Sequence, residues 1–547
     1  MDSQRNLLLM ALIVVSFLLF QQWQKEHAPV QPLTTPTTIT QPHSAELPTS
    51  TPTSLPVAAS EAAPSQPITL CSDVLALTIN PQGGDILEAQ LLAYNRNLRD
   101  QRPLPLLEQS PLFTYQAQSG LIGPQGSDNS PTNRPLYQSQ QQHYQLKEPQ
   151  TVLEVPLTYR DAQGVEFRKV FTLRQGAYAV EVRHEIINHS KQPIQVQLFG
   201  QLKQSIALPK EREKGRFALQ TYRGMAYSTT DKRYQKYSFS DLKKSDLALT
   251  TQQGWVAMLQ HYFASAWIPE PNHTYQFYTK QLISSQQAVI GFMGEMTTLQ
   301  PGEHQQLPAK LWLGPECQES MAAVAKHLDL TVDYGWLWFI SQPLFKLLKF
   351  LQRFVSNWGL AIIGITFLVR LLLYPLTKAQ YTSMAKLRLL QPKVQAIRDR
   401  WGDDRQRLSQ EMMKLYQREK VNPLGGCLPL FIQMPIFLAL YWMLVGSVEL
   451  RHAPFIGWIQ DLSAPDPYYL LPLLMGLSML LIQRLSPSPM ADPMQQKMMM
   501  IMPAVFTLFF LWFPAGLVLY YVVSNLLTLL QQQLITYQLE KKGLSLR

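Results

Sequence analysis

Residues 361–376 read AIIGITFLVRLLLYPL, an apolar run interrupted by one charge, Arg370. A run of this composition predicts part of a membrane-spanning helix. Arg370 lies eight residues before Lys378, hence roughly 12 Å inside the end of that helix at 1.5 Å per residue. A charge at this depth costs several kcal/mol unless it is paired or hydrated. One polar stripe on the apolar helix is predicted from the i, i+4, i+8 and i+11 spacing of Thr366, Arg370, Tyr374 and Thr377.

Further apolar runs follow this stretch. Together with it they predict five spans, at residues 356–376, 426–447, 468–485, 498–513 and 515–534. None of the five contains Asp, Glu or His, so the sequence offers Arg370 no internal counter-ion. Two explanations remain: the side chain snorkels to the inner headgroups, or it faces a water-filled cavity open to the cytoplasm. Polar groups for the wall of such a cavity, each equally able to make an ordinary interhelical hydrogen bond, are Gln433, Ser524, Asn525 and Thr528.

The start of the chain carries one more apolar run, LLLMALIVVSFLLF at residues 7–20, preceded by Arg5. Its length suits the core of a signal peptide, but no small-residue cleavage pattern follows it. We interpret it as an uncleaved signal-anchor, with a cleaved signal as the alternative.

Loop charges predict how the spans are oriented. Residues 378–420 hold eleven Lys and Arg against five Asp and Glu, whereas the 448–467 loop holds one Arg and three acidic residues. Basic loops stay in the cytoplasm. Six spans with both chain ends in the cytoplasm follow, with the long segment between the first two spans on the outer side.

That outer segment has two parts. Residues 28–67 hold nine Pro and eight Thr but no Lys or Arg, which predicts a linker without a core. From about residue 68 to 333, apolar and polar residues alternate with period two, as where Val180, Val182 and Ile186 are separated by charged residues. Further strands are predicted at 74–79, 151–159, 194–198, 254–268 and 311–313, with a closing helix at 319–328. The pattern predicts a large antiparallel β-sandwich.

Two helical segments outside the spans are also predicted. Lys346, Lys349 and Arg353 form a cationic stripe on an amphipathic helix at 336–353, which is typical of a helix in the membrane interface. The basic loop predicts a helical hairpin, because apolar residues recur at steps of three and four on both sides of Gly402. Asp403 or Asp404 would cap the second helix. We expect a self-packed antiparallel pair with solvated charges.

Composition narrows the classes of protein further. The 547 residues carry a net charge of +10 and a mean hydropathy of −0.09, an average that hides the segregation of apolar runs. Because much of the basic charge lies in one loop between apolar spans, it favours a cytoplasmic loop over a nucleic-acid site. Three cysteines exclude a disulfide framework. A single bond between Cys71 and Cys317, both on the oxidising side, stays open.

The sequence does not predict an enzyme. It holds no GxxxxGK[ST] loop for a nucleotide, and no CxxC or HExxH for a metal, so we expect neither cofactor nor metal. The five spans lack the acid–base groups that a proton relay or an intramembrane protease needs.

Several long motifs carry a family resemblance. They are WFISQPLFKLLKF, TFLVRLLLYPLTKAQYTSMAKLRLLQPK, NPLGGCLPLFIQMPIFLALY, DPYYLLPLLMG and FFLWFPAGLVLYYVVSN. These segments resemble the YidC membrane protein insertases of the Gram-negative type, whose core the mitochondrial and chloroplast insertases share. The resemblance covers essentially the whole chain.

The resemblance implies a multi-domain membrane protein with an α-helical five-span insertase core, an N-terminal signal-anchor helix and a large periplasmic antiparallel β-supersandwich similar to sugar mutarotases. It implies a bacterial inner-membrane protein, multi-pass, with cytoplasmic N- and C-termini. The implied function is insertion and folding of nascent inner-membrane proteins through a hydrated cationic groove, alone or with the Sec translocon. Arg370 matches the groove arginine, with Thr366 and Gln433 as polar wall and Tyr521 as a substrate-facing aromatic.

The same resemblance implies the partners. They are nascent membrane proteins, Sec translocon components and anionic lipid, with the ribosome and the signal recognition particle receptor as further candidates. The ending KKGLSLR is short, which leaves tail-mediated ribosome binding open. Two rival classes are a channel or solute transporter, which should show inverted repeats or mid-membrane ion pairs, and a membrane-tethered mutarotase-like enzyme, which would leave Arg370 unexplained.

The predicted organisation is therefore a signal-anchor span at 1–27, a linker at 28–67, a periplasmic β-sandwich at 68–333, an interfacial helix at 334–353, a second span at 354–377, a cytoplasmic hairpin at 378–421, and four spans with a short tail at 422–547.

Overall fold

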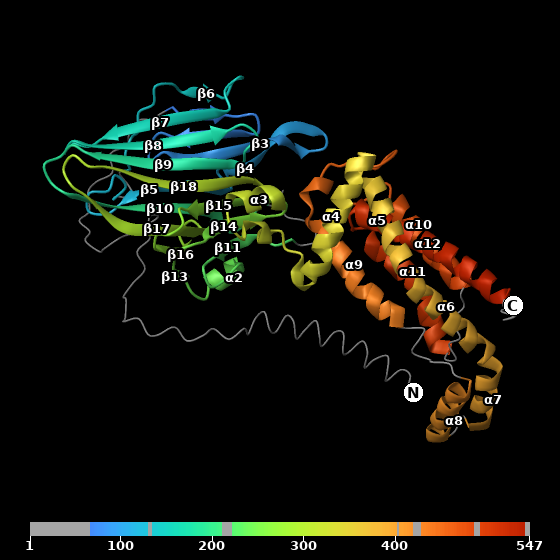
Figure 1. Cartoon of the computed structure of the whole chain (residues 1–547). Helices are drawn as coiled ribbons and strands as arrows, with labels where there is room; N and C mark the ends of the chain where they lie inside the picture. Colours follow the sequence, from blue (N-terminus) through green and yellow to red (C-terminus); the bar gives the residue numbers. More distant parts are fainter. Residues whose placement is uncertain are drawn as a thin grey trace.

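The structure, a computed structural model, describes residues 66–129, 134–209, 221–401, 404–419, 428–485 and 493–541. It contains a large β-sandwich followed by a helical C-terminal part (Figure 1). The predicted signal-anchor at 1–27, nearly all of the linker and the last residues of the tail lie outside the described residues.

The sandwich consists of two sheets. The first has the strand order β13-β16-β17-β10-β5-β4-β3-β2-β1-β6, and its pairs are antiparallel except for the parallel pair β1–β6. Its strands are β1 (Ile68–Cys71), β2 (Leu75–Asn80), β3 (Asp85–Asn97), β4 (Asp100–Gln109), β5 (Thr114–Ile122), β6 (His143–Gln145), β10 (Ile194–Ser205), β13 (Ala248–Thr251), β16 (Tyr275–Leu282) and β17 (Gln287–Leu299).

The second sheet has the order β12-β11-β14-β15-β18-β9-β8-β7. Its strands are β7 (Val152–Arg160), β8 (Val165–Arg174), β9 (Ala179–Asn188), β11 (Gly224–Ser228), β12 (Gln235–Tyr237), β14 (Trp255–Gln260), β15 (Phe263–Pro269) and β18 (His304–Pro315). A short helix α2 (Phe239–Leu242) lies between β12 and β13, and α3 (Gln318–Val324) follows β18.

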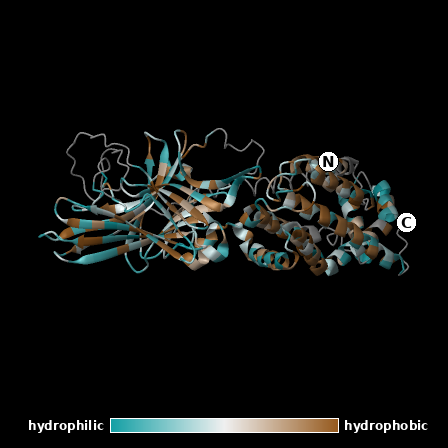
Figure 2. Cartoon of the chain, turned by 90° about the horizontal axis from the view of Figure 1, so that it is seen from above, coloured by the Kyte–Doolittle hydropathy of each residue, from teal (hydrophilic) through white to brown (hydrophobic). Residues whose placement is uncertain are grey.

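Period-two alternation produces the core, as predicted. In β9, Val180, Val182, His184 and Ile186 are buried, while Glu181, Arg183 and Glu185 between them are only half-buried. Hydrophobic and hydrophilic residues alternate along many of the strands, whereas the helices carry longer hydrophobic stretches (Figure 2). One predicted strand was wrong. Residues 254–268 form the hairpin β14–β15, because the chain turns at Tyr262, which has a φ of 72°.

The helical part begins at the end of the sandwich. It contains α4 (Trp338–Val355), α5 (Trp358–Leu372), α6 (Tyr374–Leu389), α7 (Gln391–Trp401), α8 (Arg405–Arg418), α9 (Leu428–Gly446), α10 (Leu470–Leu485), α11 (Pro493–Phe510) and α12 (Ala515–Glu540). By length and composition, α12 could cross a membrane, and α5 with α6 passes the same test as a bent pair. Gln433–Gly446, Leu470–Leu485 and Met500–Phe510 are shorter apolar helical stretches.

The span predicted at 356–376 is not one straight helix. A bend of 60° separates α5 from α6. Tyr374 and Thr377 of the predicted polar stripe lie beyond this bend: Tyr374 joins a cluster with Tyr381, Ile535 and Leu539, and the Thr377 hydroxyl donates to the Leu373 carbonyl. The predicted stripe is therefore divided between two helices, α5 and α6.

The two cysteines are not bonded. Both Cys71 and Cys317 are free thiols. Cys71 ends β1, near one edge of the first sheet, whereas Cys317 follows β18, which lies inside the second sheet. The first and last strands are thus not neighbours, which removes the argument for a bond.

Specific contacts join the sandwich to the helices. Nη2 of Arg451, in the loop after α9, donates to the carbonyls of Asn95 at 2.7 Å and Arg96 at 3.1 Å in β3. Nε2 of His261 lies 3.2 Å from the Val445 carbonyl of α9. The β3–β4 arm and the β14–β15 turn therefore both contact the segment around the end of α9.

Candidate functional site

The side chain of Arg370 lies between two long apolar helices. It is on the last turn of α5, which packs against α12. Its Nε donates to the hydroxyl of Ser524 at 3.0 Å, and its Nη2 donates to the same oxygen. Two turns further along α12, Nε2 of Gln531 donates to the Arg370 carbonyl at 3.1 Å. Both contacts tie the end of α5 to the middle of α12.

No carboxylate accompanies this guanidinium among the residues that the structure describes. Its side-chain partner there is the neutral hydroxyl of Ser524, and no ion pair to Arg370 forms in the described ranges. A guanidinium has five N–H donors, so several remain available. Arg370 is partly exposed. A cation with unused donors and an accessible surface can accept a carboxylate from another molecule.

Thr366 lies one turn before Arg370, but its hydroxyl is turned inward. The residue is only 1% exposed, and Oγ1 donates to the Ile362 carbonyl of the same helix at 2.6 Å. This back-bond satisfies the hydroxyl within α5. Sequence spacing placed the two residues on one helix face correctly, yet their side chains differ in accessibility.

Gln433 and Tyr521 reach the same region from other helices. Nε2 of Gln433 in α9 donates to the hydroxyl of Tyr520 in α12 at 3.4 Å. The Tyr521 ring lies 4.9 Å, centroid to centroid, from both Phe437 of α9 and Phe510 of α11. Gln433 is therefore linked to α12, and Tyr521 stands in an aromatic cluster where three helices meet.

Sequence reasoning missed a second polar stripe. Tyr520, Ser524, Thr528 and Gln531 recur along α12 at the same i, i+4, i+8 and i+11 spacing as the stripe proposed around Arg370. Ser524 and Gln531 contact Arg370, while Thr528 Oγ1 donates to the Ser524 carbonyl. The periodicity was present in the sequence and could have identified this helix as the partner of α5.

Asn525 belongs to a different contact. Its Nδ2 donates to the hydroxyl of Ser478 in α10 at 2.9 Å. Nε2 of Gln532 likewise donates to the Leu485 carbonyl at 3.1 Å. Asn525 thus makes an interhelical hydrogen bond to α10, as Gln433 does to α12.

The basic loop forms a helical pair, with one correction. The first arm is divided at Leu390 into α6 and α7, and α8 returns beside α7. Asp404 caps α8, accepting from the backbone N–H groups of Gln406 and Arg407. Nζ of Lys393 contacts a Glu419 carboxylate oxygen at 2.6 Å.

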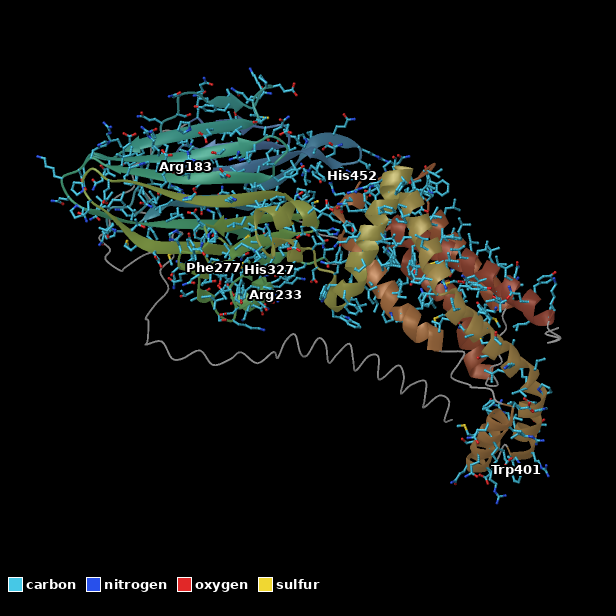
Figure 3. The ribbon with its side chains drawn as sticks, viewed as in Figure 1. Arg183, Arg233, Phe277, His327, Trp401 and His452 are labelled. Atoms are coloured by element: carbon cyan, nitrogen blue, oxygen red, sulfur yellow. The ribbon has the colours of Figure 1, made fainter. Side chains whose placement is uncertain are left out.

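This pair projects from the end of the helical part farther from the sandwich, with Trp401 at the α7–α8 turn (Figure 3). The guanidinium groups of Arg400 and Arg407 lie over the Trp401 ring, 5.9 and 5.2 Å from its centroid. No residue of α7 is fully buried, so the apolar stripe packs only partly.

Comparison with known proteins covers both halves of the chain. A family model described as the YidC periplasmic domain matches residues 67–347, and one described as the 60Kd inner membrane protein matches residues 350–542. An active YidC insertase crystal structure with its first transmembrane domain resolved is 18% identical, with a TM-score of 0.37, covering 86% of this chain and 92% of that one.

Two sugar-enzyme structures match parts of the chain. A galactose mutarotase related enzyme from Lactobacillus acidophilus is 10% identical, with a TM-score of 0.28, over 45% of this chain and 97% of that one. A putative aldose 1-epimerase from Klebsiella pneumoniae is 10% identical, with a TM-score of 0.30, over 47% and 80%.

Proposed function

The chain belongs to the YidC family of inner-membrane protein insertases, and from that premise we propose that it inserts nascent membrane proteins through a groove lined by Arg370, Thr366, Gln433 and Tyr521. Insertases of this family are not enzymes, and their substrates are nascent membrane proteins. Membership therefore sets aside both the solute transporter and the mutarotase-like enzyme as the protein's function.

One observation carries the proposed groove. The Arg370 guanidinium, set among apolar helices, meets a neutral hydroxyl and retains free donors. A structural ion pair would satisfy this charge with a carboxylate of the same chain. A hydrated site that receives carboxylates from passing clients accounts for a charge kept without such a partner.

The proposed mechanism needs no chemical step. The cationic groove transiently holds the polar or acidic segment of a nascent protein, while the hydrophobic segment moves outward along apolar helix faces. Transfer of that segment into lipid removes its apolar surface from water, which supplies the driving force. The aromatic cluster at Tyr521 would contact the hydrophobic segment on its way.

The topology and remaining partners are part of the same proposal. The family's sandwich is periplasmic. Six spans, counting the signal-anchor, with cytoplasmic N- and C-termini agree with the loop charges. The loosely packed α7–α8 pair would then be cytoplasmic and meet arriving nascent chains or the ribosome. Sec translocon components, the signal recognition particle receptor and anionic lipid complete the proposed partners.

Site-specific photocrosslinking tests the groove. A photoreactive amino acid is placed at position 366, 370, 433 or 521, and stalled ribosomes present a single-span client with an acidic N-terminus. Position 477, on the exposed surface of α10, is the matched control. We expect crosslinks from positions 370, 433 and 521 that disappear when the client lacks its hydrophobic segment, and the lowest yield of the four from the buried position 366. Crosslinks of equal yield from position 477 would refute a defined groove.

A further inference from the structure

A cavity of about 500 Å³ lies between α3, the helix that follows the sandwich, and α4. One wall belongs to α4 and carries Lys346, Lys349 and Arg353, the cationic stripe seen in the sequence. The opposite wall comes from α3 and the 3-10 turn Leu328–Thr331, and Glu449 closes one side. The volume falls within the range of small-molecule sites.

The three cations of the stripe are not equivalent. Nζ of Lys349 contacts a Glu319 carboxylate oxygen at 3.0 Å, which ties α4 to α3. Lys346 and Arg353 form no ion pair within the described ranges, although both lie close enough to Glu319 to lower its pKa, after the larger effect of Lys349. The cavity therefore contains one neutralised pair and two cations available to a ligand.

The remaining acidic groups weaken this positive charge only in part. Asp329 and Glu449 also line the cavity. Burial raises the pKa of the Glu449 carboxyl, so it takes up a proton more readily than an exposed glutamate. The side near Lys346 and Arg353 is thus the favourable place for an anion.

An apolar surface adjoins the same stripe. Phe350 lines the cavity and is 54% exposed, and Phe354, one turn later, is 74% exposed. Their rings contact each other, with centroids 4.9 Å apart. Other apolar and small residues of α4 are covered by neighbouring helices, because Ser341 and Leu348 are buried and α4 packs against α5 and α9. The exposed phenylalanines lack such cover.

Cations beside exposed apolar rings complement an anionic amphiphile. We propose that this cavity binds one anionic phospholipid, its phosphate between Lys346 and Arg353 and its acyl chains along Phe350 and Phe354. The inference rests on the proposed placement of α4 at the periplasmic membrane surface, and it is independent of the groove at Arg370. A lipid held here would lie at the junction of α3 and α4, beside the Lys349–Glu319 pair.

Native mass spectrometry of the full chain in detergent tests the site. The protein is titrated with phosphatidylglycerol or with phosphatidylcholine, and bound lipids are counted. The double variant Lys346→Gln/Arg353→Gln is compared with Lys191→Gln/Lys232→Gln, which removes two exposed charges from turns of the sandwich. We expect the first variant to bind phosphatidylglycerol roughly 10- to 30-fold more weakly, and the second to bind like the wild type.

Additional arms identify the occupant. Glycerol phosphate, the headgroup chemistry without acyl chains, should not displace bound phosphatidylglycerol at equal concentration. Three results would overturn the proposal. They are displacement of phosphatidylglycerol by glycerol phosphate, equal binding of phosphatidylglycerol and phosphatidylcholine, and unchanged phosphatidylglycerol binding by Lys346→Gln/Arg353→Gln. Client insertion by the same variants in vesicles separates the two proposals: lost lipid binding with normal crosslinking at position 370 leaves the groove intact.

Discussion

Arg370 of α5 and Ser524 of α12 meet across 154 positions of sequence, with the guanidinium Nε donating to the hydroxyl at 3.0 Å. This contact joins the charged end of one apolar helix to the polar stripe of another. A neutral hydroxyl therefore positions the Arg370 guanidinium, which leaves the guanidinium charge available to an anion from another molecule.

Arg370 should act on acidic clients through its charge. In reconstituted vesicles, Arg370→Ala should lower insertion of a client with an acidic N-terminal segment roughly tenfold, the equivalent of about 1.4 kcal/mol. Arg370→Lys should retain part of the activity, since it keeps the charge but loses the planar fork. Equal insertion by wild type and both variants would favour the snorkelling explanation.

Ser524→Ala should weaken the contact between α5 and α12. Hydrogen bonds between membrane helices contribute about 0.6–1.7 kcal/mol, and we expect a loss of this size in mixed-micelle unfolding. Thr528→Val is the matched control, because the Thr528 hydroxyl donates within α12 to the Ser524 carbonyl. If both variants lose the same stability, the Arg370–Ser524 contact does not contribute specifically.

The α7–α8 pair should open more readily than the apolar helices. No residue of α7 is fully buried, whereas α5 and α12 contribute many buried residues. Amide hydrogen exchange of the full chain should therefore be faster in α7 and α8 than in α5 and α12. Equal protection in all four helices would contradict a loosely held pair.

Lys169 should make sandwich stability depend on pH in the alkaline range. Its Nζ is buried between the sheets, donating to the carbonyls of Gly83 and Ser119, with Asp85, Asp128, Arg134 and His184 around it. Burial lowers the pKa of Lys169 from 10.5 to about 8, despite the opposing effect of Asp85. Between these values the unfolded chain binds more protons, so folding stability rises with pH.

The variant Lys169→Met isolates this effect. Relative to it, the wild type should gain about 3 kcal/mol of stability between pH 8 and pH 10.5. Calorimetric unfolding of both full chains in the same detergent measures the difference. A difference that does not change with pH would show that Lys169 titrates alike in the folded and unfolded states.

Gly359→Ala should destabilise the start of α5. An added Cβ would lie 2.0 Å from Cδ2 of the Phe455 ring, so the loop after α9 would have to shift. Overpacking of this kind costs about 1–3 kcal/mol. At Gly364 on the same helix, an added Cβ would lie 3.4 Å from Leu351 Cδ1. Thermal unfolding midpoints should fall for Gly359→Ala and stay near the wild type for Gly364→Ala.

Much of the fold was predictable because its signals are local. Period-two alternation located strands such as β2, β7 and β9, and adjacent residues narrowed the cap of α8 to Asp403 or Asp404, of which Asp404 is the cap. The sequence was misleading where a local break occurs inside an apolar segment. The 60° bend after Leu372 does not interrupt the hydrophobicity, and the turn at Tyr262 is marked only by Gln260 and His261 within an otherwise mainly apolar run. One strand and one straight helix were therefore predicted where the structure has two elements each.

The sequence by itself determined that a charge stands inside an apolar helix and that none of the five predicted C-terminal spans holds an acidic residue, because both facts follow from composition alone. Only the tertiary structure decided which side chain meets it. Helical periodicity assigns residues to a face, but the rotation and crossing of α5 and α12 choose Ser524 and Gln531 over Asn525, which the same rotation turns towards Ser478 of α10. The two cysteines follow the same rule: their positions in sequence permitted a bond, and the assignment of β1 and β18 to different sheets removed it.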